Sequence, residues 1–454
     1  MANDDKQLTD GPIWRGLTVM SAPMVLGILA VLSVGLADAY FLGKLGGAPL
    51  AAVGFIYPVT AAITSLSIGL SAGANAAVSQ AIGREDDATA TARIGLHAVA
   101  LGVFLAVGVA FLLFLMIGPL FGVLGASDNV MTEIRAFVPW WCLSFPFAVT
   151  SMLINALFRA HGNARISAIF MVSESVLNIA LTPLLVFGWA FIPGFETAGA
   201  AMATFAARAV VATAAFVWAM RRGLIFFNCQ PTKNFLQSAR TLVKVGGPAA
   251  FSNAINPAGM AAVTAAVATV GETAVAGFGA ATRIQSLALV PMFALSSGIG
   301  PVVGQNWGAE QHDRAGRAVQ VAFAFCAAYG IAIGLILAFF AEGLAGFIAS
   351  GGEATSYAAQ YLRIVGMSLF GYGFIVTANA AMNARSKAGY SMALSLTRIF
   401  VLYLPLAWVG VSLFGYTGIL IAAVCANVLG AACAVYAVNR TELFKRDNLA
   451  QTFA

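Results

Sequence analysis

Charged residues are scarce in this chain of 454 residues, because Asp, Glu, Lys and Arg make up only 9% of it. Globular proteins contain about 25% charged residues, so this composition excludes a soluble protein. Hydrophobic residues make up 60%, and they form long unbroken runs such as 98–117. A β-barrel would instead show short segments of alternating polarity. The chain is therefore expected to be an all-α polytopic membrane protein, since helices satisfy their own backbone hydrogen bonds in lipid.

Cysteine and histidine are rare as well, with five Cys and three His. An odd number of cysteines without a CxxC pair predicts neither a disulfide framework nor a zinc site. No phosphate-binding loop, serine-hydrolase elbow or metalloprotease motif is present. The sequence therefore predicts no enzyme, no cofactor and no metal, and it leaves an ion gradient as the available source of energy.

Apolar runs separated by polar breaks predict twelve membrane-spanning helices, each long enough for a hydrocarbon layer of about 30 Å. They are expected at 14–42, 50–82, 93–119, 134–160, 165–188, 197–220, 241–270, 278–307, 315–341, 355–384, 389–413 and 418–439. Of the 24 Lys and Arg residues, 18 lie on the side of the N-terminus and only two on the other side. By the positive-inside rule both termini are cytoplasmic. The basic residues are scattered among short loops and form no concentrated face, so no nucleic-acid partner is expected.

An internal repeat divides the twelve spans into two groups of six. At an offset of 225 residues Pro23 matches Pro248, and the 40 positions 46–85 contain ten identities with 271–310. Because six is even, both repeats enter the membrane in the same direction. The sequence predicts an N-lobe at 1–220, a cytoplasmic linker at 221–240 and a C-lobe at 241–454. Two such lobes favour a central cavity and need no partner subunit, so a monomer is expected; a duplicated bundle also fits a mere scaffold.

Six charged residues lie more than three residues from the ends of the predicted spans, and a charge costs about 2.5 to 3.5 kcal/mol at the bilayer centre. They are Asp38, Glu174, Arg208, Arg283, Arg363 and Arg398. Arg283 and Arg363 lie close enough to their helix ends to snorkel. Asp38 is more informative, because the second repeat has Val263 at the equivalent position. A carboxyl that the scaffold does not need can gain and lose a proton during a transport cycle, although a pair with a neighbouring Arg is the alternative.

Polar residues on neighbouring spans could surround Asp38. Glu174, Asn178 and Thr182 are spaced i, i+4, i+8 and therefore share one face of the fifth span. At an offset of 224 Glu174 corresponds to Arg398, which fits either a pair between the lobes or an asymmetry facing the substrate.

Three further residues complete the set of candidates. Asn155 in the fourth span and Thr204 in the sixth could join a hydrogen-bonded network, although such residues also bridge packed helices. Pro23 removes one hydrogen bond from the first span and permits a bend that protonation could bias.

Several stretches together resemble the multidrug and toxic compound extrusion (MATE) transporters over nearly the whole chain. They are ADAYFLGKLGGAPLAAVG at 37–54, NALFRAHGN at 155–163, LNIALTPLLVFG at 177–188, PVVGQNWGA at 301–309 and the region 398–408. The resemblance implies two six-helix lobes around a V-shaped cavity, and export of amphipathic or cationic compounds in exchange for protons or sodium. In the DinF-like branch the acid of the first helix couples the ion, and Asp38 occupies that position. Pro23 lies where that branch bends this helix, and Asn155, Asn178 and Thr204 match its polar network.

The chain departs from the family pattern at Thr182, where a second acid is usual. Sodium is helped by several hard oxygen ligands and by carboxylate charge, so the departure favours protons, although Glu174 could compensate. A flippase of lipid-linked saccharides is a second hypothesis, for which only Arg208 and Arg398 are deep cationic candidates. A membrane prenyl-transferring enzyme is a third, but the one acidic cluster, 85–87, is typical of a solvated turn.

Overall fold

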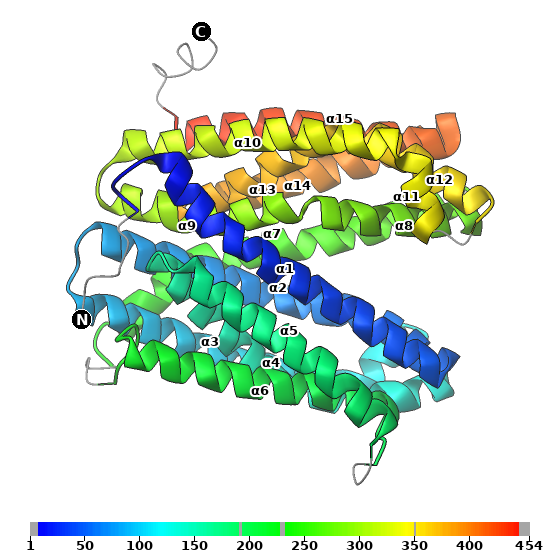
Figure 1. Ribbon diagram of the computed structural model, residues 1–454, viewed down its shortest axis with the longest axis horizontal. Coiled ribbons are helices and arrows are strands. Elements are labelled where there is room, and N and C mark those ends of the chain that lie inside the picture. The colour runs from blue at the N-terminus through cyan, green and yellow to red at the C-terminus, as the bar shows by residue number, and fades with distance from the viewer. Residues whose placement is uncertain (1–7, 190–192, 228–231, 349–350, 445–454) are drawn as a thin grey trace. The chain divides into compact units, whose positions relative to one another are not determined.

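The structure is a computed structural model that describes residues 8–189, 193–227, 232–348 and 351–444. Residues 228–231, inside the predicted linker, and the two chain ends lie outside the described residues. Every regular element in the described part is helical (Figure 1). The first six helices are α1 (Ile13–Leu45), α2 (Gly47–Gly83), α3 (Ala88–Val123), α4 (Asp128–Ala160), α5 (Ala164–Phe187) and α6 (Glu196–Arg221). The others are α7 (Phe235–Ala268), α8 (Glu272–Ala288), α9 (Val290–Gly308), α10 (His312–Phe339), α11 (Ala341–Ile348), α12 (Glu353–Val365), η1 (Gly366–Ser368), α13 (Leu369–Ala384), α14 (Ala388–Leu396), η2 (Thr397–Tyr403) and α15 (Leu404–Arg440).

Interruptions in the second half reconcile these helices with twelve spans, which confirms the predicted fold class. Helices α8 and α9 form one span that bends by 45°. The elements α12, η1 and α13 follow one another without a gap and form another span. Gly415 separates the last two spans with a φ of 58° and a ψ of −139°. Glycine reaches this conformation without a steric penalty, because it has no Cβ.

The chain forms two compact units that do not follow the first and second halves of the sequence. Unit 1 contains Leu26–Ala250, and unit 2 contains Gln7–Val25 and Phe251–Ala454, as far as these are described. The two boundaries, after Val25 and after Ala250, are 225 residues apart, like Pro23 and Pro248. The beginning of each repeat's first helix therefore belongs to the unit formed by the other repeat. The lobe boundaries at 220 and 241 stay a prediction.

Each unit is built around the fourth span of its repeat. In unit 1, α4 packs against α2, α3 and α6, and its buried side chains include Ile134, Phe145 and Phe158. In unit 2, α13 packs against α9, α10 and α15. The same element is central in both units because both repeats fold in the same way.

Glycines allow the first helices to pack closely within each unit. A Cβ at Gly69 of α2 would lie 2.4 Å from the Gly246 carbonyl oxygen of α7, and one at Gly73 would lie 2.6 Å from the Leu242 carbonyl oxygen. In unit 2, a Cβ at Gly298 of α9 would lie 2.4 Å from Ser21 Oγ of α1. Small residues let helix backbones approach in this way within membranes.

Candidate functional site

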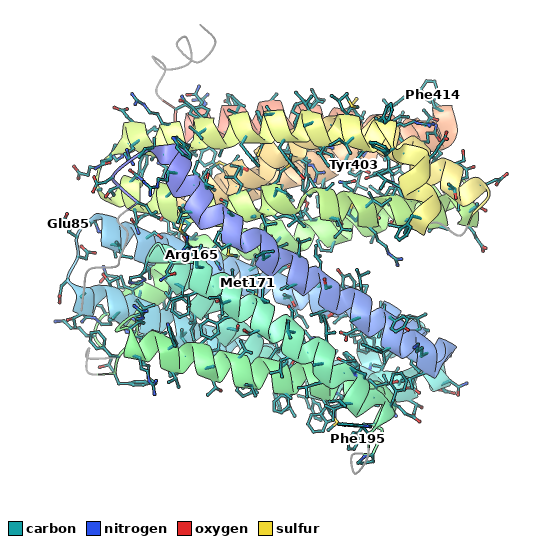
Figure 2. The ribbon with its side chains drawn as sticks, viewed as in Figure 1. Glu85, Arg165, Met171, Phe195, Tyr403 and Phe414 are labelled. Carbon is teal, nitrogen blue, oxygen red and sulfur yellow. The ribbon has the colours of Figure 1, made fainter. Side chains whose placement is uncertain are left out.

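Helices α1 and α5 pack together in unit 1 and bring Asp38 to Thr182. Met171 of α5, labelled in Figure 2, fills the space beside Gly27, where a Cβ would lie 3.1 Å from its sulfur. Asp38 and Thr182 each lie 11 residues, about three helical turns, after that contact. The Thr182 hydroxyl interacts with the Asp38 carboxyl. The Oδ1 atom of Asp38 is buried and has no hydrogen-bond partner, so this acid has an acceptor free for a proton or a cation.

A short hydrogen-bonded chain links α5 to α6 beside this acid. Asn178 Nδ2 donates to Thr204 Oγ1 over 3.1 Å, and the Thr182 hydroxyl donates to the Asn178 carbonyl over 2.9 Å. Thr204 Oγ1 donates in turn to the Ala200 carbonyl over 3.1 Å. Asn178 is buried and its Oδ1 atom has no partner. Asn178 and Thr182 of the stripe on α5 are therefore buried within unit 1, whereas Glu174 is partly exposed.

The second acid of the site, Glu174, is held by a cation and a hydroxyl. Its Oε1 atom lies 3.7 Å from Arg208 Nε of α6, and its Oε2 atom accepts from Ser151 Oγ of α4 over 3.2 Å. Arg208 Nη1 donates to Ser144 Oγ over 2.9 Å. The charge of Arg208 also acts on Asp38. Two acids thus share one arginine, which reduces the cost of placing all three charges inside a helical bundle.

The sequence marks Arg208 as a charge inside a span and as a cationic candidate of a flippase, and it does not single out Ser144 and Ser151 as members of the site. Register supplies a signal for each: Thr204 and Arg208 are four residues apart, and Ser144, Ser151 and Asn155 are spaced by seven and four. Residues at such spacings share one helix face.

Two candidates stand apart from the hydrogen-bonded chain. Asn155 is buried on α4, and its Oδ1 atom has no partner. Pro23 lies in the part of α1 that belongs to unit 2, and α1 stays helical through it. Their roles in coupling and in bending stay predictions.

The chemistry of the site is that of oxygen ligands with little negative charge. Within the described ranges, no group of three or more His, Cys, Asp and Glu could hold a metal ion. Thr182 supplies an oxygen in contact with Asp38, and Asn178 and Thr204 are joined to Thr182 by hydrogen bonds. Hard oxygens of this kind suit sodium, but sodium is usually helped by more carboxylate charge. A single acid with an unpartnered oxygen suits a proton equally well without further ligands.

The sequence profile of the MatE family matches this chain twice, at residues 23–184 and at residues 248–409. The two matches are offset by 225 residues, which confirms the internal repeat. One relative, the FAD transporter of Shewanella oneidensis, is 32% identical over 406 residues, which cover 89% of each chain. The probable multidrug resistance protein YpnP of Bacillus subtilis is 24% identical over 404 residues, covering 88% of this chain and 87% of that one.

Among solved structures, the Vibrio cholerae MATE transporter VcmN in its bent form is similar over 96% of this chain and 98% of its own. The TM-score is 0.90 and the sequence identity is 29%. The tandem match covers well over half of the sequence, so this chain belongs to the MatE family of transporters.

Proposed function

We propose that the chain exports small amphipathic organic compounds, cationic ones among them, in exchange for protons, and that Asp38 couples the two movements. Deprotonated Asp38 accompanies substrate binding, and its protonation from outside releases the substrate. Protons entering down a membrane potential supply about 2.3 kcal/mol per charge for each 100 mV. The observation that carries this proposal is the buried, unpartnered Oδ1 atom of Asp38 beside Thr182, where the family pattern has a second acid.

The test is efflux of a fluorescent organic cation from proteoliposomes that hold the purified protein. A proton gradient alone is expected to drive efflux by the wild type, and Asp38→Asn is expected to abolish gradient-driven efflux while leaving the protein folded. Asp86→Asn is a matched control, because Asp86 lies in a loop and pairs with the exposed Arg84. Unchanged efflux by Asp38→Asn would refute the assignment.

Sodium is the alternative coupling ion, and Asp38, Asn178, Thr182 and Thr204 would then supply the oxygen ligands, with Glu174 as a further acid. The same liposomes with a sodium gradient distinguish the two ions. Efflux driven by sodium and not by protons would replace the proposed ion. A saccharide-lipid flippase has less support, because Glu174 already neutralises Arg208, one of its two deep cationic candidates.

The transporter is a monomer in the cytoplasmic membrane, with both termini in the cytoplasm. The Shewanella relative named FAD transporter adds an anionic aromatic dinucleotide to the compounds to be assayed as substrates.

A further inference from the structure

Arg398 in unit 2 is a cation inside a span whose donors are only partly used. It lies in the π-helical segment η2, which also contains Tyr403, labelled in Figure 2. Arg398 Nη2 donates to Asn427 Oδ1 over 3.1 Å, and Nη1 donates to Asn256 Oδ1 over 3.5 Å. The Nε atom is buried and has no partner. A guanidinium has five donor hydrogens, so three remain beyond these two hydrogen bonds, two on the terminal nitrogens and one on the buried Nε atom.

The equivalent position of the first repeat shows what Arg398 lacks. At an offset of 224, Arg398 corresponds to Glu174, and Ser368 corresponds to Ser144. In unit 1 the chain of contacts runs from Glu174 to Arg208 and then to Ser144.

In unit 2 the corresponding chain runs from Arg398 to Asn427, whose Nδ2 atom donates to Ser368 Oγ over 2.9 Å. The two repeats thus keep one arrangement of charged side chain, bridging side chain and serine. In the first repeat the charged residue has an oppositely charged partner, whereas in the second the bridging residue is a neutral amide.

The charge of Arg398 therefore has no acid bound to it in the described part of the chain. Among the residues that the structure describes, no carboxylate forms an ion pair with Arg398, whereas Arg363 of the same unit pairs with Glu342 over 2.7 Å. Arg398 instead contacts the amides of Asn256 and Asn427 and the ring of Tyr372, whose centroid lies 4.7 Å from the guanidinium carbon. Arg398, Asn256 and Tyr372 are each partly exposed, so none of the three is sealed inside the packed core of unit 2.

We propose that Arg398, assisted by Asn256 and Tyr372, binds the oxyanion of an organic substrate, either a carboxylate or a phosphate. The planar fork of a guanidinium matches two oxygens of such a group. Tyr372 beside it offers a face on which an aromatic part of the same molecule stacks. The inference rests on the proposed export function, and it names anionic or zwitterionic aromatic compounds as a substrate class.

A matched pair of dyes tests this assignment. Rhodamine 110 carries a free carboxylate, and rhodamine 123 is its methyl ester. Binding of each dye to the purified full-length protein in phosphatidylcholine nanodiscs is measured by fluorescence polarisation. The wild type is expected to bind the carboxylate dye more tightly than the ester. Arg398→Gln is expected to weaken binding of the carboxylate dye about tenfold or more, the effect of losing a charge-assisted hydrogen bond, and to leave the ester unchanged.

Arg283→Gln is the matched control, because it removes the same charge from an exposed position of α8 in the same unit. Equal weakening for both dyes, or no change for either, would overturn the proposal. Nanodiscs that also contain phosphatidylglycerol provide a further arm. A carboxylate preference that vanishes there would assign the site to a lipid headgroup and overturn the substrate assignment.

The two proposals fail separately. Proton-driven efflux that persists in Asp38→Asn would refute the coupling role while the dye preference of Arg398 stands. Absence of a preference for the carboxylate dye, together with proton-driven efflux of the methyl ester, would refute the role of Arg398 while the coupling role of Asp38 stands.

Discussion

At the scale of single residues, Glu174 can have either of two roles. It either stabilises the fold through its ion pair with Arg208 or takes part directly in ion coupling. Glu174→Gln leaves Arg208 with Ser144 and the charge of Asp38 but without its nearest acid. Because both side chains are about one quarter exposed, at 27% and 23%, the loss is smaller than for a fully buried pair. We expect the free energy of unfolding to fall by about 1 to 3 kcal/mol. Thermal unfolding in detergent, followed by tryptophan fluorescence, measures it.

The double variant Glu174→Gln with Arg208→Gln is the control for this pair. Removing both charges is expected to recover most of the lost stability, because no unpaired cation is left. A double variant as unstable as the sum of both single variants would show that the pair contributes nothing. A stable Glu174→Gln that no longer exports with an ion gradient would instead make Glu174 an ion ligand.

Helix register explains why part of the site was predictable. The spacing of Glu174, Asn178 and Thr182 requires only that the segment be helical, and the structure places Asn178 and Thr182 among the buried residues. The pairing of Glu174 with Arg208 depends on how α5 and α6 pack, and no periodicity within one segment carries that information. The absence of an acid beside Arg398, within the described residues, likewise becomes visible only once α13, η2 and α15 are folded together.

At the scale of helices, the division of α1 and α7 between the two units was not predictable. Each first helix was predicted as one unbroken span, at 14–42 and at 241–270, so the sequence assigns each helix to one lobe. The structure divides each helix two residues after its proline, at Val25 and Ala250. This division follows from helix packing, because the beginning of α7 packs against Gly69 and Gly73 of α2, and the beginning of α1 packs against Gly298 of α9.

Gly69→Ala tests this packing within unit 1. The added Cβ would lie 2.4 Å from the Ala250 amide nitrogen and from the Gly246 carbonyl oxygen, and backbone atoms cannot turn away as a side chain can. Helices α2 and α7 would have to separate, so we expect a loss of about 1 to 3 kcal/mol in stability. The thermal unfolding midpoint in detergent reports it.

Gly108→Ala on α3 is the matched control, because the residue is exposed and no described atom lies within 4 Å of the place that the new methyl group would take. Its stability should stay the same or rise slightly, since alanine favours helices over glycine by about 1 kcal/mol. Equal midpoints for Gly69→Ala and Gly108→Ala would show that the close approach contributes nothing to stability.

At the scale of the whole molecule, the described ends of the chain lie at the same end of unit 2. Arg314, near the start of α10, donates to the Gly11 carbonyl over 2.7 Å. A Cβ at Gly316, half a turn further on, would lie 2.3 Å from the Leu443 carbonyl oxygen. Gly11 and Leu443, close to the two ends of the described residues, therefore lie at the start of one helix. Two segments at the same end of a helical bundle are separated by an even number of spans, which agrees with twelve.

The distribution of basic residues predicts that the end of the molecule near both termini faces the cytoplasm. Alkaline phosphatase is active only outside the cytoplasm, so its fusion after Leu45, between α1 and α2, should be active. Its fusion after Asp87, between α2 and α3, should be inactive. Lys44 is the single basic residue beside the first site, whereas Arg84 and Arg93 flank the second. A fluorescent protein that folds only in the cytoplasm, fused after Arg440, should be bright. The opposite pattern would mean that both termini lie outside the cytoplasm. Protons that bind Asp38 from outside would then have to enter through the end of the molecule that carries both termini.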